Sequence, residues 1–99
     1  MKQYLVTAYD YTDAGAFERR MNVRPHHIEG LKPLKQNGNY LVGGSMLDEN
    51  GKMIGSVMIM QFETEEELET WTKTDPYITQ KIWERYEIKP FKVAEFWPL

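Results

Sequence analysis

Cysteine is absent from this sequence of 99 residues. Its absence excludes disulfide bonds, thiolate metal sites and a cysteine nucleophile together. The nucleophiles that remain available are hydroxyl groups, carboxylates, lysines and histidines.

Long apolar runs and a surplus of basic charge are missing as well. No stretch approaches the length of a membrane span, and residues 1–10 lack an apolar core long enough for a signal peptide. The 12 basic and 15 acidic residues are interspersed and give a formal net charge of -3, so no basic field is present to hold a phosphate backbone. We therefore expect a cytoplasmic protein with neither a membrane nor a nucleic-acid partner.

The composition is sufficient for one packed interior. Apolar residues account for 41% of the sequence and aromatic residues for 13%, and nothing indicates a second hydrophobic core. We expect a single domain over residues 1–99. Because a chain of this length buries only a modest fraction of its surface alone, dimerisation would add burial.

The predicted elements follow the order β-α-β-β-α-β. Runs of β-forming residues, with a hairpin signal at Asn50-Gly51, place strands at residues 3–9, 40–46, 52–62 and 84–96. Capping residues and proline positions place helical segments at residues 14–20, 24–36, 64–73 and 76–82. This order is the split βαβ pattern of ferredoxin-like α+β folds, with an antiparallel sheet and both main helices on one face.

Apolar side chains on the strand predicted at residues 52–62 point to both faces of the sheet. They are Met53, Ile54, Val57, Met58, Ile59 and Met60. A half-solvated antiparallel strand would alternate apolar and polar residues instead. A second copy stacked sheet against sheet would bury the outer set, which predicts a homodimer through the sheet face. The alternative is a monomer with an exposed apolar patch.

The helix predicted at residues 24–36 distinguishes the two histidines. At about 100 degrees per residue, His27 shares a stripe with Leu31 and Leu34, whereas His26 lies about a quarter-turn or more away. His27 is therefore expected to face the sheet, where a desolvated imidazole requires a hydrogen-bond partner. It is either a buried histidine satisfied by a backbone carbonyl or a general acid or base.

Asp75 also has two interpretations. Its position before Pro76-Tyr77 suits it to cap a helical turn. A carboxylate has two oxygens, so it can cap with one while it orients an imidazole with the other. The capping role and a role beside His27 are therefore compatible.

Ligand-binding candidates lie near the predicted ends of these elements. Arg24 and Arg20 are fork-shaped donors for an anionic substrate, or else solvated surface charges. Ser45 offers a hydroxyl group beside Gly44, where a glycine pair leaves space above the sheet. The adjacent histidines lack the spacing of metal ligands, so we predict no metal and no cofactor.

Five short motifs occur in order along nearly the whole chain. They are Arg24-Pro25-His26-His27, Leu41-Val42-Gly43-Gly44-Ser45-Met46, Gly55-Ser56, Asp75-Pro76-Tyr77 and Lys89-Pro90-Phe91-Lys92. Together they resemble the YCII-related (YciI-like) family. The resemblance implies a dimeric α+β barrel, in which two ferredoxin-like sheets face each other, and an active site of one histidine and one aspartate.

The resemblance assigns these two residues to positions in this sequence. The family histidine, fourth in an Arg-Pro-x-His pattern, falls on His27, and the aspartate of Asp-Pro-Tyr falls on Asp75. Where the family commonly has Gly-Pro at the end of the second strand, this sequence has Gly44-Ser45, which alters the pocket floor or adds a hydroxyl donor. Substrate preference therefore transfers poorly from the family.

Two hypotheses from different classes follow. The first is a cofactor-independent enzyme in which neutral His27, held by Asp75, moves a proton on a small cyclic or aromatic acid-like substrate, as in elimination or isomerisation. Arg24, Ser45 and Gly44 would bind that substrate. The alternative is a non-catalytic dimer that binds a ligand or supports a larger assembly, and an oxygenase without a metal ranks last.

Overall fold

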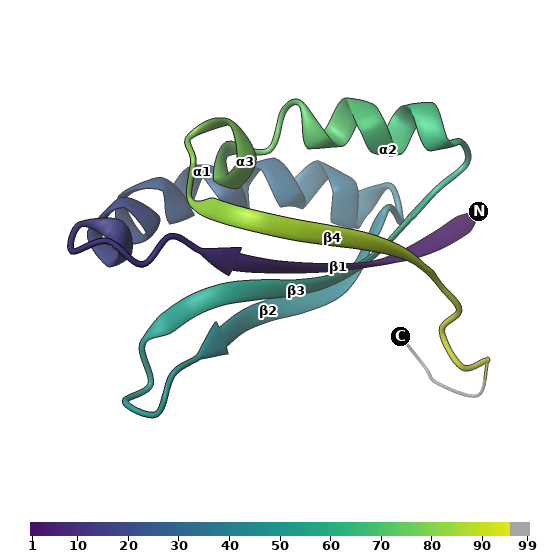
Figure 1. Cartoon of the computed structure of the whole chain (residues 1–99). Coiled ribbons are helices and arrows are strands. Elements are labelled where there is room, and N and C mark those ends of the chain that lie inside the picture. The colour runs from purple at the N-terminus through teal and green to yellow at the C-terminus, as the bar shows by residue number, and fades with distance from the viewer. Residues whose placement is uncertain (96–99) are drawn as a thin grey trace.

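The computed structural model describes residues 1–95 of the chain. Its elements, in order, are β1 (Lys2–Asp10), α1 (Ala16–Gln36), β2 (Tyr40–Leu47), β3 (Met53–Phe62), α2 (Glu65–Thr72), α3 (Pro76–Thr79) and β4 (Trp83–Phe91). The strands form one antiparallel sheet in the order β2-β3-β1-β4. Figure 1 shows the helices gathered on one side of this sheet. The architecture is the ferredoxin-like α+β fold that the sequence predicts.

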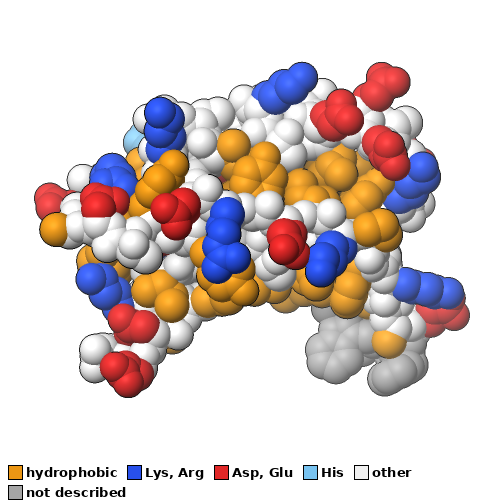
Figure 2. Space-filling model, in the orientation of Figure 1, with side chains coloured by type: hydrophobic (Ala, Val, Ile, Leu, Met, Phe, Trp, Pro, Cys, Tyr) orange, Lys and Arg blue, Asp and Glu red, His pale blue; other side chains and the backbone are white. Residues whose placement is uncertain are grey.

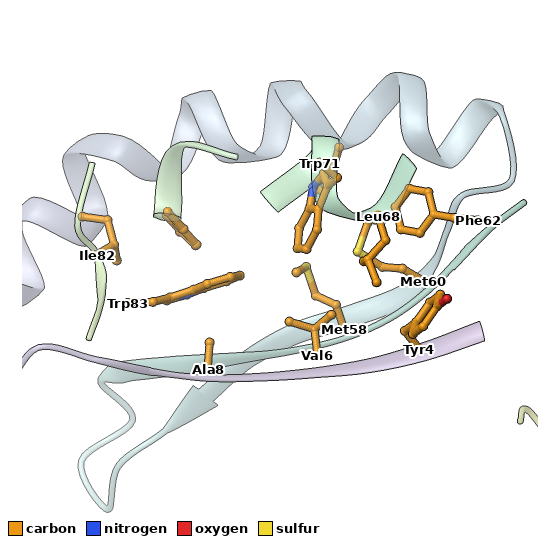
Figure 3. Close-up of a cluster of buried hydrophobic side chains, with 12 residues drawn as sticks. Tyr4, Val6, Ala8, Met58, Met60, Phe62, Leu68, Trp71, Ile82 and Trp83 are labelled. Atoms are coloured by element: carbon orange, nitrogen blue, oxygen red, sulfur yellow. The ribbon is translucent and has the colours of Figure 1, made fainter. Parts of the chain in front are cut away.

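The hydrophobic core lies between the sheet and the helices. Alternate residues of β1 and β3 point to the helical side, as the two-residue period of a strand requires, and they meet apolar side chains of α2 and the start of β4. Figure 3 shows this cluster, which includes Tyr4, Val6, Ala8, Met58, Met60, Phe62, Leu68, Trp71, Ile82 and Trp83. One packed layer thus joins elements from both halves of the chain.

Helix α1 is longer than either of the two helical segments predicted from the sequence in this region. The segments expected at residues 14–20 and 24–36 are one continuous helix with Pro25 and Pro33 inside it. An interior proline removes a backbone hydrogen bond and costs about 3 kcal/mol. Both prolines are exposed, whereas Arg20, His27 and Leu31 lie on the buried side of the helix. Packing of that stripe on the sheet offsets the local cost.

The predicted C-terminal ends of two other elements, a helix and a strand, are also wrong. The helical turn expected at residues 76–82 stops at Thr79, because Lys81 adopts a left-handed φ of 58° and the Ile82 N–H returns to the Tyr77 carbonyl at 3.0 Å. The strand expected at residues 84–96 begins at Trp83 and ends at Phe91, where its partner strand β1 begins. Residue 96 of that prediction lies outside the described residues.

The sheet face opposite the helices is covered by no other element in residues 1–95. Leu5 and Thr7 of β1 and Val57 and Ile59 of β3 are half-buried there, and Val42 of β2 is 43% exposed. Figure 2 shows charged side chains of both signs across the front of the molecule and hydrophobic side chains along the underside of the sheet. The central strands therefore present apolar groups on a second face, as their sequence indicates.

Replacement of the adjacent glycines of β2, Gly43 and Gly44, by alanine is expected to change the stability of the protein by different amounts. A Cβ at Gly43 would lie 2.7 Å from both the Val57 carbonyl oxygen and the Tyr40 hydroxyl, whereas a Cβ at Gly44 would have no neighbour within 4 Å. Gly43→Ala should therefore lower the free energy of unfolding by about 1–3 kcal/mol, the usual cost of overpacking. Urea unfolding measures this cost, with Gly44→Ala as the matched control. Equal losses for the two variants would contradict the assigned contacts.

Candidate active site

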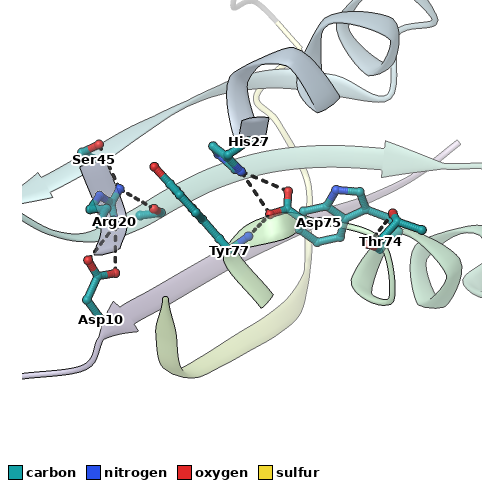
Figure 4. Close-up of polar contacts among 9 residues, drawn as sticks. Asp10, Arg20, His27, Ser45, Thr74, Asp75 and Tyr77 are labelled. Carbon is teal, nitrogen blue, oxygen red and sulfur yellow. Dashed lines mark hydrogen bonds and ion pairs between the residues drawn. The ribbon is translucent and has the colours of Figure 1, made fainter. Parts of the chain in front are cut away.

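His27 and Asp75 lie side by side although 48 residues separate them. The His27 Nδ1 atom is 3.1 Å from each carboxylate oxygen of Asp75, and both residues are 5% exposed. Figure 4 shows the imidazole reaching down from α1 to the carboxylate at the start of α3. The partner of His27 is thus a side-chain carboxylate, not the backbone carbonyl considered from the sequence.

Local structure positions each member of this pair. His27 lies on the buried stripe of α1, and Asp75 is the N-cap of α3, where its Oδ1 accepts the Tyr77 N–H at 2.8 Å. Pro76 follows at the first position of that helix, where a missing N–H has no cost. Asp75 therefore caps a helix and holds an imidazole with the same carboxylate, as its two oxygens allow.

Aromatic rings fix the plane of the imidazole. The Tyr77 ring stacks on His27 with centroids 3.8 Å apart and planes inclined by 8°, and Trp83 meets His27 edge-on at 6.4 Å. An ionised carboxylate only accepts hydrogen bonds, so Nδ1 of a neutral His27 carries the proton and Nε2 has the free lone pair. Within residues 1–95, Nε2 has no hydrogen-bond partner and is not sealed from solvent. It is the atom of His27 that can exchange a proton with a ligand.

The imidazole borders a cavity of about 120 Å³ between α1, α3 and the β2-β3 hairpin. Its lining includes the polar side chains of Arg20, Arg24, His27, Tyr40, Ser45, Ser56 and Tyr77. An apolar cavity of about 150 Å³ can hold benzene, so this one is slightly smaller than the space around a single ring, and a ring-sized ligand would project beyond it. Larger hollows, of about 310, 360, 560 and 620 Å³, do not include His27 in their lining.

An arginine that the sequence left unresolved organises one wall of this cavity. Arg20 is 1% exposed, and its Nη1 donates to both oxygens of Asp10 at 2.8 and 2.9 Å. Its Nη2 donates to the hydroxyl oxygens of Ser45 at 3.1 Å and Ser56 at 2.9 Å. Arg20 therefore connects α1 to three strands and leaves both serine hydroxyl hydrogens free to turn toward a ligand.

Burial changes the proton affinity of groups near the cavity. Desolvation raises the pKa of the Asp10 carboxyl group, and the hydrogen bond from Arg20 opposes that rise. Desolvation also raises the pKa of the Tyr77 hydroxyl, against the opposing charges of Arg20 and Arg24. Tyr77 therefore keeps its proton at neutral pH and can donate it in a hydrogen bond.

The predicted ligand-binding residues also reach this cavity. Arg24 lies one helical turn beyond Arg20, lines the cavity and forms no ion pair with any residue in the described part of the chain. Ser45 and Gly44 contribute from β2. The free guanidinium makes the cavity suited to a ligand with an anionic group.

Among residues 1–95, no three His, Asp or Glu side chains are grouped to hold a metal ion. No helix in this range is long and apolar enough to cross a membrane.

The fold and the site define a class: a small α+β domain with a buried histidine–aspartate pair at the edge of a ligand-sized cavity. A sequence profile of the YCII-related domain matches residues 2–92. The chain is 35% identical over 95 residues to Protein YciI of Escherichia coli O6:H1, which covers 90% of this chain and 95% of the relative. It is 32% identical over 100 residues to fusaric acid biosynthesis protein 2 of Gibberella moniliformis, covering 93% and 94%.

A solved structure shares the fold. The 5-chloro-2-hydroxyhydroquinone dehydrochlorinase of Burkholderia phenoliruptrix, in complex with 2,5-dihydroxybenzoquinone, superimposes with a TM-score of 0.79 at 23% identity and covers 95% of this chain and 97% of its own. The chain belongs to the YCII-related family.

Proposed function

We propose that this protein is a cofactor-independent lyase or isomerase in which His27 transfers a proton to or from a small ring-containing acid. The observation that carries the proposal is the buried His27–Asp75 pair, whose free Nε2 atom belongs to a residue lining the cavity. A histidine held in this tautomer by a carboxylate is a common general base.

The proposed reaction begins with the transfer of one proton to His27. Nε2 accepts a proton from a carbon or hydroxyl group of the substrate, and the electrons of that bond form a new double bond. In an elimination, the electron pair displaced by this double bond leaves with a departing group such as chloride. In an isomerisation, the imidazolium returns its proton to another atom of the same molecule. In an elimination, the imidazolium releases its proton to solvent instead. In both cases Asp75 stabilises the imidazolium while it holds the proton.

Arg24 and Ser45 are proposed to bind the substrate. Arg24 supplies an unpaired positive charge at the cavity, and the Ser45 hydroxyl, which accepts from Arg20, can donate its own hydrogen to a ligand oxygen. Proline at this position would have no hydroxyl group, so Gly44-Ser45 gives this chain a donor that the Gly-Pro pattern lacks. We expect a preference for substrates with an additional oxygen substituent.

A turnover screen tests the proposal. Lactones, halogenated phenols and halogenated hydroquinones are incubated with the protein, and product formation is followed by chromatography and by release of halide. The dehydrochlorinase with the same fold motivates the halogenated compounds. Conversion of one of them at a rate that depends on His27 supports the proposal. Binding of these compounds without any conversion would favour the alternative function, a ligand-binding or accessory dimer.

We also propose that the protein forms a homodimer through the open face of its sheet, in the cytoplasm. The half-buried apolar residues of the central strands support this arrangement, because a monomer rarely leaves such a face to solvent. Stacking two sheets about 10 Å apart would bury Val57 and Ile59 of both copies.

Ile59→Asp is expected to convert the dimer to a monomer. A carboxylate at the centre of the stacked sheets would be desolvated without a partner, which costs far more than one interface contact contributes. Light scattering coupled to size-exclusion chromatography should change from twice the chain mass of 11.7 kDa to that mass. Lys32→Glu, on the exposed surface of α1, is the control and should leave the dimer intact. An Ile59→Asp protein that remains dimeric would rule out this interface.

A further inference from the structure

The Tyr77 side chain combines deep burial with an unused hydrogen-bonding group. Tyr77 is 1% exposed, and its hydroxyl is sealed from solvent without a hydrogen-bond partner among residues 1–95. A buried hydroxyl that forms no hydrogen bond costs free energy. Since Tyr77 also lines the cavity of His27, its hydroxyl is available to a ligand that occupies the cavity.

A second unused donor belongs to the same wall. Arg20 engages Asp10, Ser45 and Ser56 through its two terminal nitrogens, but its Nε atom is sealed and has no partner in the described part of the chain. The Arg20 guanidinium carbon lies 4.8 Å from the centre of the Tyr77 ring. Two unpaired donors thus come from contacting residues that both line the cavity of His27.

The direction of the Tyr77 ring places its hydroxyl away from the histidine–aspartate contact. Figure 4 shows the ring extending from the backbone beside Asp75 toward the side of the site where Arg20 and Ser45 lie, with the oxygen at its far end. The ring itself stacks on His27. One side chain therefore supports the base with its face and presents a donor at its tip.

We propose that the Tyr77 hydroxyl binds an oxygen atom of the substrate, and that the substrate is a ring carrying a hydroxyl or carbonyl group in addition to the group on which His27 acts. This inference rests on the proposed function in that it uses the same cavity. The Ser45 hydroxyl and the Arg20 Nε group supply further donors on that wall. Oxygen substituents accept from such donors, whereas a hydrocarbon ring would leave them unpaired.

The ionisation of Tyr77 supports a donor role. Desolvation raises the pKa of its hydroxyl above the ordinary value. A neutral phenol presents its hydrogen to an acceptor, and a substrate oxygen that becomes negative as His27 removes a proton would be a better acceptor than the same oxygen before reaction. Tyr77 is then a substrate-contacting residue with a larger contribution in the transition state than in the bound ground state.

Calorimetric titration with 2,5-dihydroxybenzoquinone and with catechol tests the assignment. Tyr77→Phe keeps the ring that stacks on His27 and removes only the hydroxyl. We expect the dissociation constant to rise about tenfold or more, the effect of losing one hydrogen bond worth about 1.4 kcal/mol. Tyr4→Phe is the matched control, because the Tyr4 hydroxyl is also sealed and unpartnered but belongs to a core residue that does not line this cavity. It should leave binding unchanged.

Each outcome separates this inference from the proposed function. Weaker binding by Tyr77→Phe alone supports the donor role, even when the wild-type protein converts neither compound. Equal binding by Tyr77→Phe and Tyr4→Phe overturns the donor role, even when His27-dependent turnover is found. Failure of the wild-type protein to bind either compound overturns the substrate class proposed here.

Discussion

Replacing His27 with alanine is expected to lower turnover of the substrate found in the screen by about 10²–10⁴-fold, the usual contribution of a general acid or base. The fold should survive, because the variant removes one ring from a core that is otherwise intact, although the loss of stacking on Tyr77 lowers its stability. His26→Ala is a control at the neighbouring position, since the His26 side chain is exposed and does not line the cavity. It should retain full activity.

Asp75→Asn separates the orienting role of this carboxylate from its capping role. Asparagine is also a good N-cap, so α3 should form and circular dichroism should be unchanged. Its amide can donate to Nδ1, which would move the imidazole proton to Nε2 and remove the lone pair that accepts from the substrate. A change of this kind in a hydrolase lowered turnover about 10⁴-fold.

Nitrogen NMR of His27 reports the tautomer directly and needs no substrate. The wild-type protein should carry its proton on Nδ1, and Asp75→Asn should carry it on Nε2. Full activity in both His27→Ala and Asp75→Asn would eliminate the proposed mechanism.

Arg20→Met is expected to lower the free energy of unfolding by about 3–5 kcal/mol. It leaves the buried Asp10 carboxylate without its ion pair and removes the donor shared by Ser45 and Ser56. A loss of this size in a domain of about 100 residues should lower the melting temperature by more than about 10 °C. Calorimetry or thermal circular dichroism measures the shift.

Arg19→Met is a control at the adjacent residue. Arg19 also pairs with an aspartate, Asp13, at 2.7 Å, but both side chains are exposed and the pair is screened by solvent. Its hydrogen bond holds the pKa of Asp13 at about 2, yet its removal should change the melting temperature little.

A double variant tests the physical cause. Asp10→Leu combined with Arg20→Met replaces the whole buried pair with apolar side chains and should recover part of the stability that Arg20→Met loses, because no uncompensated charge remains. A double variant no more stable than Arg20→Met would show that the cost comes from lost packing.

The arrangement of the sheet and the residues facing it could be predicted because local patterns agree with the final packing. A turn that contains Asn50-Gly51 connects β2 to β3 as the sequence indicates, and Gly51 has a left-handed φ of 80°, a conformation that glycine adopts readily. Thr64 caps α2 by accepting the Glu67 N–H. In each case a few neighbouring residues determine the conformation without help from the rest of the chain.

Helix α1 shows where local patterns mislead. Pro25 is a favourable first-turn residue, so the sequence predicts a helix that begins at Arg24. In the folded protein the helix begins two turns earlier because its buried side packs on the sheet. A helix that begins at Arg24 leaves out Arg20. However, Arg20 and His27 are seven residues apart, close to two full turns, and therefore lie on the same side of the longer helix. Extending the same periodicity toward the N-terminus would have identified Arg20 as a buried residue.

Other parts of the site depend on contacts between distant segments that local patterns do not contain, and only the family resemblance brought His27 and Asp75 together. The position of Asp75 as a cap was predictable from Asp-Pro-Tyr, but its contact with His27 arises from the packing of α3 against α1. Similarly, the stacking of Tyr77 on His27 depends on the relative placement of two helices. Burial of the Tyr77 hydroxyl follows from the same placement and has no separate signal in the sequence.

The short turn that contains Asp75, Pro76 and Tyr77 determines the dimensions of the site. Its carboxylate orients the base, and its aromatic ring supports that base from two residues further along the chain. A shift of this turn would carry both groups in the same direction and leave their separation nearly constant. The turn thus fixes the separation between the carboxylate that orients His27 and the phenol oxygen of Tyr77, so the segments around the cavity can vary while these two groups keep their spacing.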